Sequence, residues 1–291
     1  MRILTYQDND TLKLGIKTDD GVIAVEGLTS APDIPTTPDA FYRMGLEAVD
    51  KLASLVADNI DPQHLLDESA LTLGACVPNP GKILCVGLNY RKHAAESGMD
   101  APSSPVMFSK FNNTIAADGE VIPNSTEYTQ IDYEAELVVV IGKQAKAVSE
   151  SEALDYVLGY CNANDLSERN LQIGQPGGQW LLGKTPDKFL PIGPYMVTAD
   201  EVGDPQAMSI KGWLNGEERQ NSNTSDMIFT IAQVIAFVSR FMTLNPGDII
   251  STGTPEGVIL GMEDKVWMQA GDEYVIEIGN LGRLSNTIGE A

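Results

Sequence analysis

The sequence predicts a β-rich α+β fold, and three observations support this prediction. Short runs of β-branched and aliphatic residues recur along the 291-residue chain, and the run from Leu137 to Ile141 is typical of a strand buried on both faces. Asn215-Gly216 lies between two such runs and is a strong β-hairpin signal. Helical patterns are few and do not alternate regularly with the strands, which disfavours a doubly wound parallel sheet.

Residues 1–73 are predicted to form a small N-terminal domain with an α/β meander. Three strands are expected at Arg2 to Gln7, Thr11 to Lys17 and Val22 to Glu26, because turn residues separate these runs. Thr37 followed by Pro38 marks the start of a helix that the apolar spacing extends to about Asp58. A boundary near Leu73 leaves residues 74–291 as a larger second domain.

The second domain is predicted to consist mainly of strands. A capping box at Ser149-x-x-Glu152 predicts a helix from Glu150 to Val157, and a second, amphipathic helix is expected from Ile228 to Met242. The strands are expected at Lys82 to Leu88, Val106 to Lys110, Ile131 to Ile141, Leu158 to Asn162, Tyr195 to Thr198, Met208 to Leu214, Asp248 to Thr252, Glu273 to Ile278 and Arg283 to Thr287.

The charge balance excludes some classes of partner. The chain has 19 Lys and Arg residues against 41 Asp and Glu residues, so its formal net charge is −22. Binding to nucleic acid or to an anionic membrane requires positive surface, so neither is expected as a partner. An anionic substrate would need local positive charge from lysine, arginine or a metal ion.

The amino terminus and the cysteines predict a soluble, cytoplasmic protein. The three cysteines are odd in number and scattered, which argues against a disulfide framework and suits a reducing compartment. Asp8 and Asp10 interrupt the start of the chain before any apolar run long enough for a signal peptide. No segment approaches the roughly 18 apolar residues of a membrane span.

Glu134 and Glu136 are the first candidate metal ligands. They precede and enter the strand that ends at Ile141, and because side chains alternate along a strand, both point the same way as Val138 and Val140. Two like charges about 7 Å apart beside an apolar layer are costly unless one is protonated or a cation lies between them. A hard divalent ion satisfies this requirement. The alternative is that both glutamates lie in solvent at a strand end.

Asp165 is a candidate third carboxylate. The segment from Asn162 to Asn170 follows a strand and opens a helix. Asp165 either caps this helix, with Glu168 three residues later completing the box, or joins the two glutamates as a ligand of an octahedral ion. Spacing alone favours the cap, because caps are far commoner than metal sites.

His93 and Glu96 are candidates for acid–base chemistry. The segment from Val86 to Gly98 is predicted to be a strand, a turn and a short helix, on which these two residues meet on one face. A carboxylate that orients a histidine makes it a better general base. The helix has no large apolar stripe, so it is also a candidate lid. The alternative is an ordinary surface pair.

The segment from Gly178 to Thr185 matches the P-loop pattern, but we reject nucleotide hydrolysis. The variable positions of the pattern are bulky, and Pro186, Pro191 and Pro194 prevent a following helix of normal length. Lys184 therefore stands as a positive charge suited to an oxyanion or enolate, or as a surface lysine. The turn from Ser251 to Gly257 exposes backbone amides that suit a carboxylate, although a plain connection is also possible.

Taken together, five ordered motifs resemble the fumarylacetoacetate hydrolase superfamily from about Lys82 to Ile288. The motifs are Gly-Leu-Asn-Tyr-x-x-His-x-x-Glu at 87 to 96, Glu-x-Glu at 134 to 136, Asn-Asp-x-Ser-x-Arg-x-x-Gln at 164 to 172, Gly-Lys-x-x-Asp-x-Phe-x-Pro-x-Gly-Pro at 183 to 194 and Thr-Gly-Thr-Pro-x-Gly-Val at 252 to 258. The resemblance implies a mixed β-sandwich roll, usually a homodimer.

The resemblance also implies a set of roles for individual residues. Mg²⁺ or Mn²⁺ would bind a 2-oxo acid while held by Glu134, Glu136 and Asp165. Other residues would bind or act on the substrate: Lys184, Arg169 and Gln172 line the site, Gly253 and Thr254 hold the substrate carboxylate, and His93 with Glu96 activates water. The expected reaction is hydrolysis of a carbon–carbon bond in an acylpyruvate- or fumarylacetoacetate-like acid. Oxaloacetate decarboxylation and keto–enol or double-bond isomerisation are the alternatives, and a catalytically idle ligand-binding protein is another.

Overall fold

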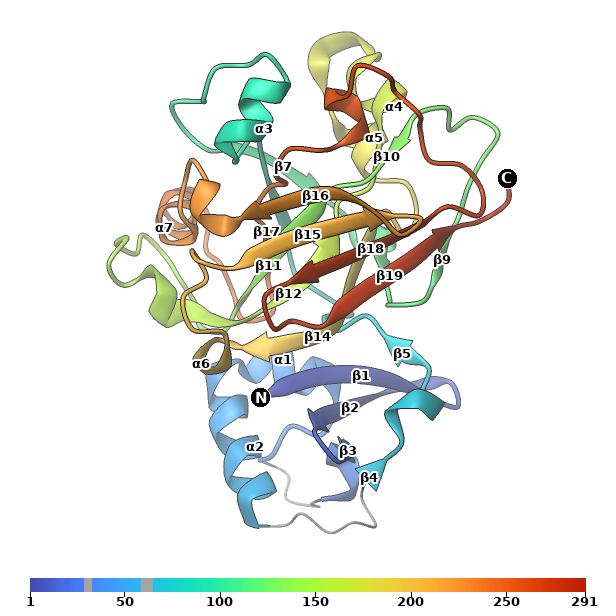
Figure 1. The fold of residues 1–291 in the computed structure, drawn as a ribbon. Coiled ribbons are helices and arrows are strands. Elements are labelled where there is room, and N and C mark those ends of the chain that lie inside the picture. Colours follow the sequence, from blue (N-terminus) through green and yellow to red (C-terminus); the bar gives the residue numbers. More distant parts are fainter. Residues whose placement is uncertain (29–32, 59–64) are drawn as a thin grey trace.

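The computed structural model describes residues 1–28, 33–58 and 65–291, which form two large sheets and several short helices. Among these residues the larger sheet has 12 strands and the smaller sheet has 5. In Figure 1 the amino-terminal strands and two helices lie below, and the smaller sheet crosses the front of the upper part. The predicted β-rich α+β fold is confirmed.

The larger sheet runs without a break from the amino-terminal strands into the rest of the chain. Its order is β4-β3-β2-β1-β14-β12-β11-β17-β6-β7, with β5 paired to β1 and β8 paired to β14. The join is made where Arg2 and Ile3 of β1 pair with Val197 and Met196 of β14. The bounds of its strands are β1 Arg2–Asp8, β2 Thr11–Thr18, β3 Gly21–Ala24, β4 Leu65–Leu66, β5 Leu73–Gly74, β6 Ile83–Gly87, β7 Val106–Lys110, β8 Ile115–Ala116, β11 Ala135–Ile141, β12 Val157–Asn164, β14 Leu190–Thr198 and β17 Ile249–Ser251.

The smaller sheet has the order β16-β15-β18-β19-β9. The predicted hairpin at Asn215 and Gly216 joins β15 to β16, and both turn residues have positive φ angles, 51° and 81°, as a type I′ turn requires. The bounds are β9 Val121–Ile122, β15 Ser209–Leu214, β16 Glu217–Asn223, β18 Glu273–Ile278 and β19 Arg283–Ile288, and a separate ribbon pairs β10 (Ile131–Asp132) with β13 (Ser167–Glu168).

Strand β11 lies between two apolar cores. Leu137, Val139 and Ile141 belong to the cluster between the two sheets, which also contains residues of β15, β18 and β19. Val138 and Val140 belong to the cluster on the opposite face, which contains residues of β1, β2, α1 and α2. The expectation of a strand buried on both faces is confirmed, and this double burial fixes the position of the acidic residues at its start.

The helices differ in part from those expected. The predicted helix from Pro38 to Asp58 is two helices, because Gly45 has a φ of 69° and its Cα lies so near Gly142 that a Cβ would come within 2.0 Å of the Gly142 oxygen. The bounds are α1 Pro38–Met44, α2 Leu46–Asp58, α3 Arg91–Glu96, α4 Arg169–Ile173, α5 Leu181–Lys184, α6 Ala199–Val202 and α7 Ile231–Phe241.

Three other elements correct the predictions. The expected helix from Glu150 to Val157 is only a 3₁₀ helix at Ala153–Tyr156, because the Ser149 hydroxyl bonds the Glu152 carboxylate instead of capping a backbone amide. The strand expected over Ile131 to Ile141 is broken between β10 and β11. Strand β14 begins at Leu190, five residues before the expected start, and the prolines within it are accommodated because Pro191 lies beside the short strand β8.

Within the described residues, no helix is both long and apolar enough to cross a membrane. The amino-terminal part shares the larger sheet and one apolar core with the rest of the chain. The boundary near Leu73 therefore does not coincide with a break in the sheet, and the division at that point stays a prediction.

Candidate metal centre and active site

The three predicted metal ligands lie together where β11 begins and β12 ends. Glu136 is on β11, Glu134 immediately precedes that strand, and Asp165 immediately follows β12. Ala135 pairs with Asn164 in this antiparallel ladder, so the two strand ends meet. One carboxylate oxygen of each acid lies within 4.8 Å of the others, and all three residues are buried. A hard divalent cation binds such a set of oxygen ligands.

Three buried cations surround these acids. The Nζ atom of Lys184 lies 2.8 Å from Glu134 Oε2 and 2.8 Å from Asp165 Oδ2, so it bridges two of them. Arg169 Nη2 lies 2.6 Å from Glu134 Oε1. The ammonium of Lys110 donates to Asp165 Oδ1 and to the Leu166 carbonyl oxygen. Each charge of Glu134 and Asp165 therefore has a cationic partner from this chain.

Glu136 differs from its two neighbours. Its Oε2 atom accepts hydrogen bonds from the Ser251 hydroxyl and, at 3.0 Å, from the Gly253 amide, but within the described residues it forms no ion pair. Burial and the negative charges of Asp165 and Glu134 raise its pKa well above the usual value. Burial also opposes ionisation of Glu134, but Lys184 and Arg169 outweigh it and lower the pKa of Glu134 to about 2.

The donor set fits a divalent cation. Oxygen ligands from three acids converge, and one of them, Glu136, has hydrogen-bond donors but no positive partner. A cation among the three would supply the charge that Glu136 lacks, which is the condition under which a buried carboxylate stays ionised. The predicted grouping of Glu134, Glu136 and Asp165 is thus present in the structure, and their role as ligands stays a prediction.

Asp165 does not cap a helix. The cap of α4 is Glu168, whose side chain accepts a hydrogen bond from the Leu171 amide at 2.6 Å. The Glu168 carboxylate also accepts from the amides of Thr129 and Gln130. The cap that spacing favoured for Asp165 is wrong, because the helix begins four residues after it and the Asp165 carboxylate is already paired with two lysines.

Arg169 and Gln172 lie at the start of α4, beside the acids. Arg169 binds Asp132 as well as Glu134, and its Nη1 atom donates to Gln172 Oε1 at 2.8 Å. Asp132 also accepts from the amides of Ile259 and Leu260 at 2.8 and 3.0 Å. Arg169 is therefore fixed by Asp132. The Gln172 side-chain oxygen is occupied by Arg169, and its NH₂ group donates no hydrogen bond to another described residue.

His93 and Glu96 face each other on α3, with 3.6 Å between His93 Nδ1 and Glu96 Oε1. His93 is only 7% exposed, so the alternative of an ordinary surface pair is wrong. Neither of the two facing atoms has a hydrogen-bond partner among the described residues. The other Glu96 oxygen accepts from the Gly257 amide at 2.8 Å, and Gly261 lies so close that a Cβ there would overlap Glu96 Oε1. The carboxylate is held in place while its inner oxygen stays free.

The turn at Gly253 and Thr254 is placed partly as predicted. Thr254 lines the same cavity as His93, and its hydroxyl accepts from the Gln220 amide at 2.9 Å. The Gly253 amide, however, donates to Glu136. Gly253 thus contacts a candidate ligand in this structure, and Thr254 is the residue of this turn that faces the cavity.

These side chains line one cavity of about 140 Å³. It brings together seven of the predicted site residues, from five separate segments of the chain. They are His93, Glu134, Glu136, Arg169, Gln172, Lys184 and Thr254. The P-loop-like segment gives no phosphate cradle, because α5 has only four residues and Lys184, at its end, is paired with two carboxylates.

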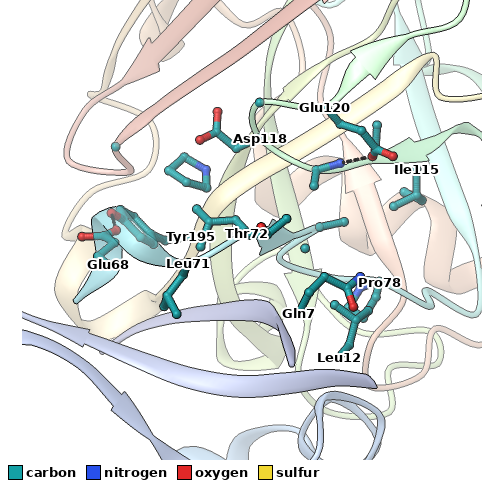
Figure 2. Close-up of a pocket in the computed structure, with 18 of the residues that line it drawn as sticks. Gln7, Leu12, Glu68, Leu71, Thr72, Pro78, Ile115, Asp118, Glu120 and Tyr195 are labelled. Atoms are coloured by element: carbon teal, nitrogen blue, oxygen red, sulfur yellow. Dashed lines mark hydrogen bonds between the residues drawn. The ribbon is translucent and has the colours of Figure 1, made fainter. Parts of the chain in front are cut away.

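A second and larger cavity, of about 1040 Å³, lies where the amino-terminal strands meet β8 and β14 (Figure 2). Its acidic residues are already engaged. Tyr195 donates to Glu68, Asp118 accepts from the Ser285 amide, and Glu120 pairs with Lys188. None of the site residues predicted from the sequence lines this cavity.

Two buried charged residues that pair with members of this site were not predicted from the sequence. Lys110 is buried at the end of β7, and Asp132 is buried two residues before Glu134. Asp132 carried a usable signal, because it continues the alternation of Glu134 and Glu136. Lys110 carried a weaker one, a single charge that ends a short apolar strand.

Comparison with known proteins agrees with this geometry. Residues 82–289 match the family described as fumarylacetoacetate (FAA) hydrolase C-terminal. The chain is 39% identical over 290 residues to the mitochondrial oxaloacetate tautomerase fahd2 of Xenopus laevis, which covers 99% of this chain and 90% of that protein.

Solved structures give the same result. The fumarylacetoacetate hydrolase from psychrophilic Exiguobacterium antarcticum has a TM-score of 0.84 at 29% identity, with 100% of each chain covered. The maleylpyruvate hydrolase from Sphingobium sp. SYK-6, in complex with manganese(II) ion and pyruvate, has a TM-score of 0.80 at 29% identity, again with 100% of each chain covered. The family match and the three-acid group beside a buried lysine and a His–Glu pair agree with each other. This chain therefore belongs to the fumarylacetoacetate hydrolase family, which is a family of enzymes.

Proposed function

We propose that this protein is a divalent-cation-dependent enzyme that forms the enolate of a small 2-oxo acid, and that its favoured reaction interconverts the keto and enol forms of oxaloacetate. The observation that carries the proposal is that Glu134, Glu136, Lys184 and His93 line one cavity, with Asp165 beside the two glutamates and Glu96 facing His93.

Mg²⁺ or Mn²⁺ would be held by Glu134, Glu136 and Asp165 and would polarise the keto oxygen of the substrate and stabilise negative charge on it. The similarity to an enzyme solved with manganese and pyruvate supports this choice of ion and of substrate class. The hydrogen bonds of Ser251 and Gly253 orient Glu136 for this role.

The residues of the chain do the rest. Lys184 lies at the acids with its charge fixed in a buried site, where it stabilises the oxygen that becomes negative in the enolate. The Gln172 NH₂ group and Thr254 hydroxyl, both in the cavity wall, bind and orient the carboxylate. His93 removes the proton from the carbon next to the keto group, with Glu96 stabilising the charged ring, and the electron pair moves to the keto oxygen. The oxygen then takes a proton from water to give the enol while His93 releases its proton to water, and the reverse reaction runs through the same steps.

Two observations favour interconversion over hydrolysis as the main reaction. This chain is 39% identical to an oxaloacetate tautomerase and 29% identical to the maleylpyruvate hydrolase, each over nearly the whole chain, while the putative hydrolase of Burkholderia lata, at 44% identity, has no substrate in its name. The cavity volume of about 140 Å³ is well below the roughly 300 Å³ at the lower end for drug-sized ligands, so a four-carbon acid suits it.

Carbon–carbon hydrolysis, the reaction first expected, is the second candidate. It is favoured by the His93–Glu96 pair, because Glu96 can stabilise the charged ring that forms when His93 takes a proton from water. Both reactions begin with the same enolate, and they differ in whether His93 moves a proton on carbon or activates water.

The experiment follows both reactions in the same preparation. Loss of the enol absorbance of oxaloacetate measures interconversion, and pyruvate release from oxaloacetate and from acylpyruvates measures decarboxylation and hydrolysis. We expect the first to dominate with Mg²⁺ or Mn²⁺ and to stop with EDTA. Pyruvate release from acylpyruvates as the faster reaction would make the protein a hydrolase. No turnover of any 2-oxo acid would favour a ligand-binding protein without catalysis.

We also propose that the protein is a homodimer, as the family resemblance implies. Light scattering after size-exclusion chromatography tests this, and a single mass near the 31.3 kDa of one chain would contradict it.

A further inference from the structure

The small cavity has an apolar side in addition to its acids and Lys184. We call this side the apolar wall, and it consists of Val86, Leu88, Met99, Phe108, Ile173, Trp180 and Leu260. Its members come from β6 and the residue after it, the segment after α3, β7, α4, the residue before α5, and the 3₁₀ helix Ile259–Gly261. An acid whose keto and carboxylate groups lie at the polar side would direct its remaining carbons toward this wall.

Trp180 is the largest side chain of the apolar wall, and its ring is fixed by two contacts. It meets the Phe108 ring edge to face, with 5.3 Å between the ring centroids and 69° between the planes. It also lies directly against the backbone of Gly87, where a Cβ would come within 2.6 and 2.8 Å of ring carbons Cζ3 and Cη2. The Trp180 ring can therefore occupy this position only because residue 87 is a glycine.

Phe108 links this ring to the polar side. The Nζ atom of Lys184 lies 5.1 Å from the centroid of the Phe108 ring, within the range of a cation–π contact. Glu134 and Asp165 hold Lys184, Lys184 contacts Phe108, and Phe108 contacts Trp180. These contacts fix the distance between the acids and the Trp180 ring.

We propose that Trp180 determines substrate specificity by limiting the length of the acid that the site accepts. This inference rests on the proposed action on 2-oxo acids, and it adds that the substrate class is short. A longer acid, with its keto end at the polar side, would have to displace a ring that Gly87 and Phe108 hold in place. Close packing makes that displacement costly.

The test compares wild type with three variants on a series of straight-chain 2,4-dioxo acids of increasing length. Trp180→Ala removes the ring, and Trp180→Phe keeps a smaller one. Leu182→Ala is the matched control, because Leu182 is on α5 close to Trp180 but is 59% exposed and does not line the cavity. Measurements are kcat/KM with Mg²⁺ for each acid, and calorimetric binding of saturated 2-oxo acids of the same lengths.

We expect wild type and Leu182→Ala to prefer the shortest acids. Trp180→Ala should raise the ratio of long-acid to short-acid kcat/KM by about 10- to 200-fold for each methylene that newly fits, with Trp180→Phe in between. Binding of the long acids should tighten in the same order. Thermal unfolding checks that each variant is folded.

The outcomes separate this inference from the proposed function. A wild type that turns over long and short acids equally would overturn the specificity role. Folded Trp180→Phe and Trp180→Ala variants whose kcat/KM depends on acid length as in wild type would overturn it as well. Both outcomes leave the enzyme proposal intact. A wild type that neither binds nor turns over any acid of the series and also fails to interconvert the two forms of oxaloacetate would overturn the proposed function itself.

Discussion

This molecule has one large cavity with few buried charges and one small cavity beside many buried charges. The cavity at the junction of the amino-terminal strands with β8 and β14 is about 1040 Å³ (Figure 2), and two of its acids, Glu68 and Glu120, form ion pairs with partly exposed lysines. The cavity at the start of β11 is about 140 Å³, and four buried acids and three buried cations line it or contact residues that line it. Those acids are Asp132, Glu134, Glu136 and Asp165, and the cations are Lys110, Arg169 and Lys184.

The difference shows that volume alone is a poor guide to a functional site. Burying charge is expensive, so a chain retains a cluster of buried ionisable groups where their chemistry is used. In the large cavity the Glu120–Lys188 pair has side chains 38% and 37% exposed, and ion pairs of that kind contribute little to stability. The comparison predicts that substitutions in the small cavity affect function strongly and that those in the large cavity do not.

The largest effect is expected from Glu136→Gln. This change keeps the shape but removes the one carboxylate that lacks a cationic partner. Mutation of a residue that only orients a metal ligand typically lowers activity by roughly 10- to 100-fold, and the loss of a ligand itself should lower turnover by more than this. Calorimetry should show no Mn²⁺ binding. Asp118→Asn, in the large cavity, is the control and should leave both unchanged. A Glu136→Gln protein with wild-type Mn²⁺ affinity would remove Glu136 from the ligand set.

A large effect on turnover alone is expected from His93→Ala. Loss of a positioned general base should lower kcat by about 10²- to 10⁴-fold while Mn²⁺ affinity stays as in wild type. Lys92→Ala is the matched control, because it removes the neighbouring side chain of the same helix, which is 64% exposed. Equal activity of His93→Ala and Lys92→Ala would show that His93 does not handle a proton.

Two ion pairs give a direct comparison of stability in the two cavities. Lys110→Met leaves Asp165 with one cation fewer in a fully buried place and should lower the free energy of unfolding by about 3–5 kcal/mol. Lys188→Met breaks the exposed pair with Glu120 and should cost about 0–1 kcal/mol. Urea unfolding without added metal measures both. Equal losses would mean that the buried pair is no more important than the exposed one.

A small effect, on stability alone, is expected from Tyr195→Phe in the large cavity. It removes the hydroxyl that donates to Glu68 and should lower the free energy of unfolding by about 1 kcal/mol, with turnover unchanged. The same urea titration and the oxaloacetate assay measure it. A fall in turnover without loss of stability would indicate that the large cavity takes part in function after all.

The sequence predicted the parts of the site that depend on local pattern. The alternation along β11 placed Glu134 and Glu136 on one side, and the spacing of His93 and Glu96 placed them on one helix face. The two-residue turn at Asn215 and Gly216 was also predictable, because few residues adopt positive φ angles there.

Features that depend on long-range packing were not predictable in this way. Spacing favoured Asp165 as the helix cap, whereas Glu168 caps α4 and Asp165 forms ion pairs with Lys110 and Lys184. Lys110 is 55 residues from its partner in sequence, and no local pattern reports such a contact. The break at Gly45 likewise depends on the backbone of Gly142, which is distant in the chain.

Because β1 pairs with β14, removal of the amino-terminal residues should affect the solubility of the remaining fragment. A fragment starting at residue 74 would lose the strand that covers Met196 and Val197, and it would expose to water a layer that Ile3, Phe41 and Leu52 normally shield. Bare strand edges next to uncovered apolar side chains readily join to other chains. Such a fragment should precipitate, even though it would contain every side chain of the small cavity.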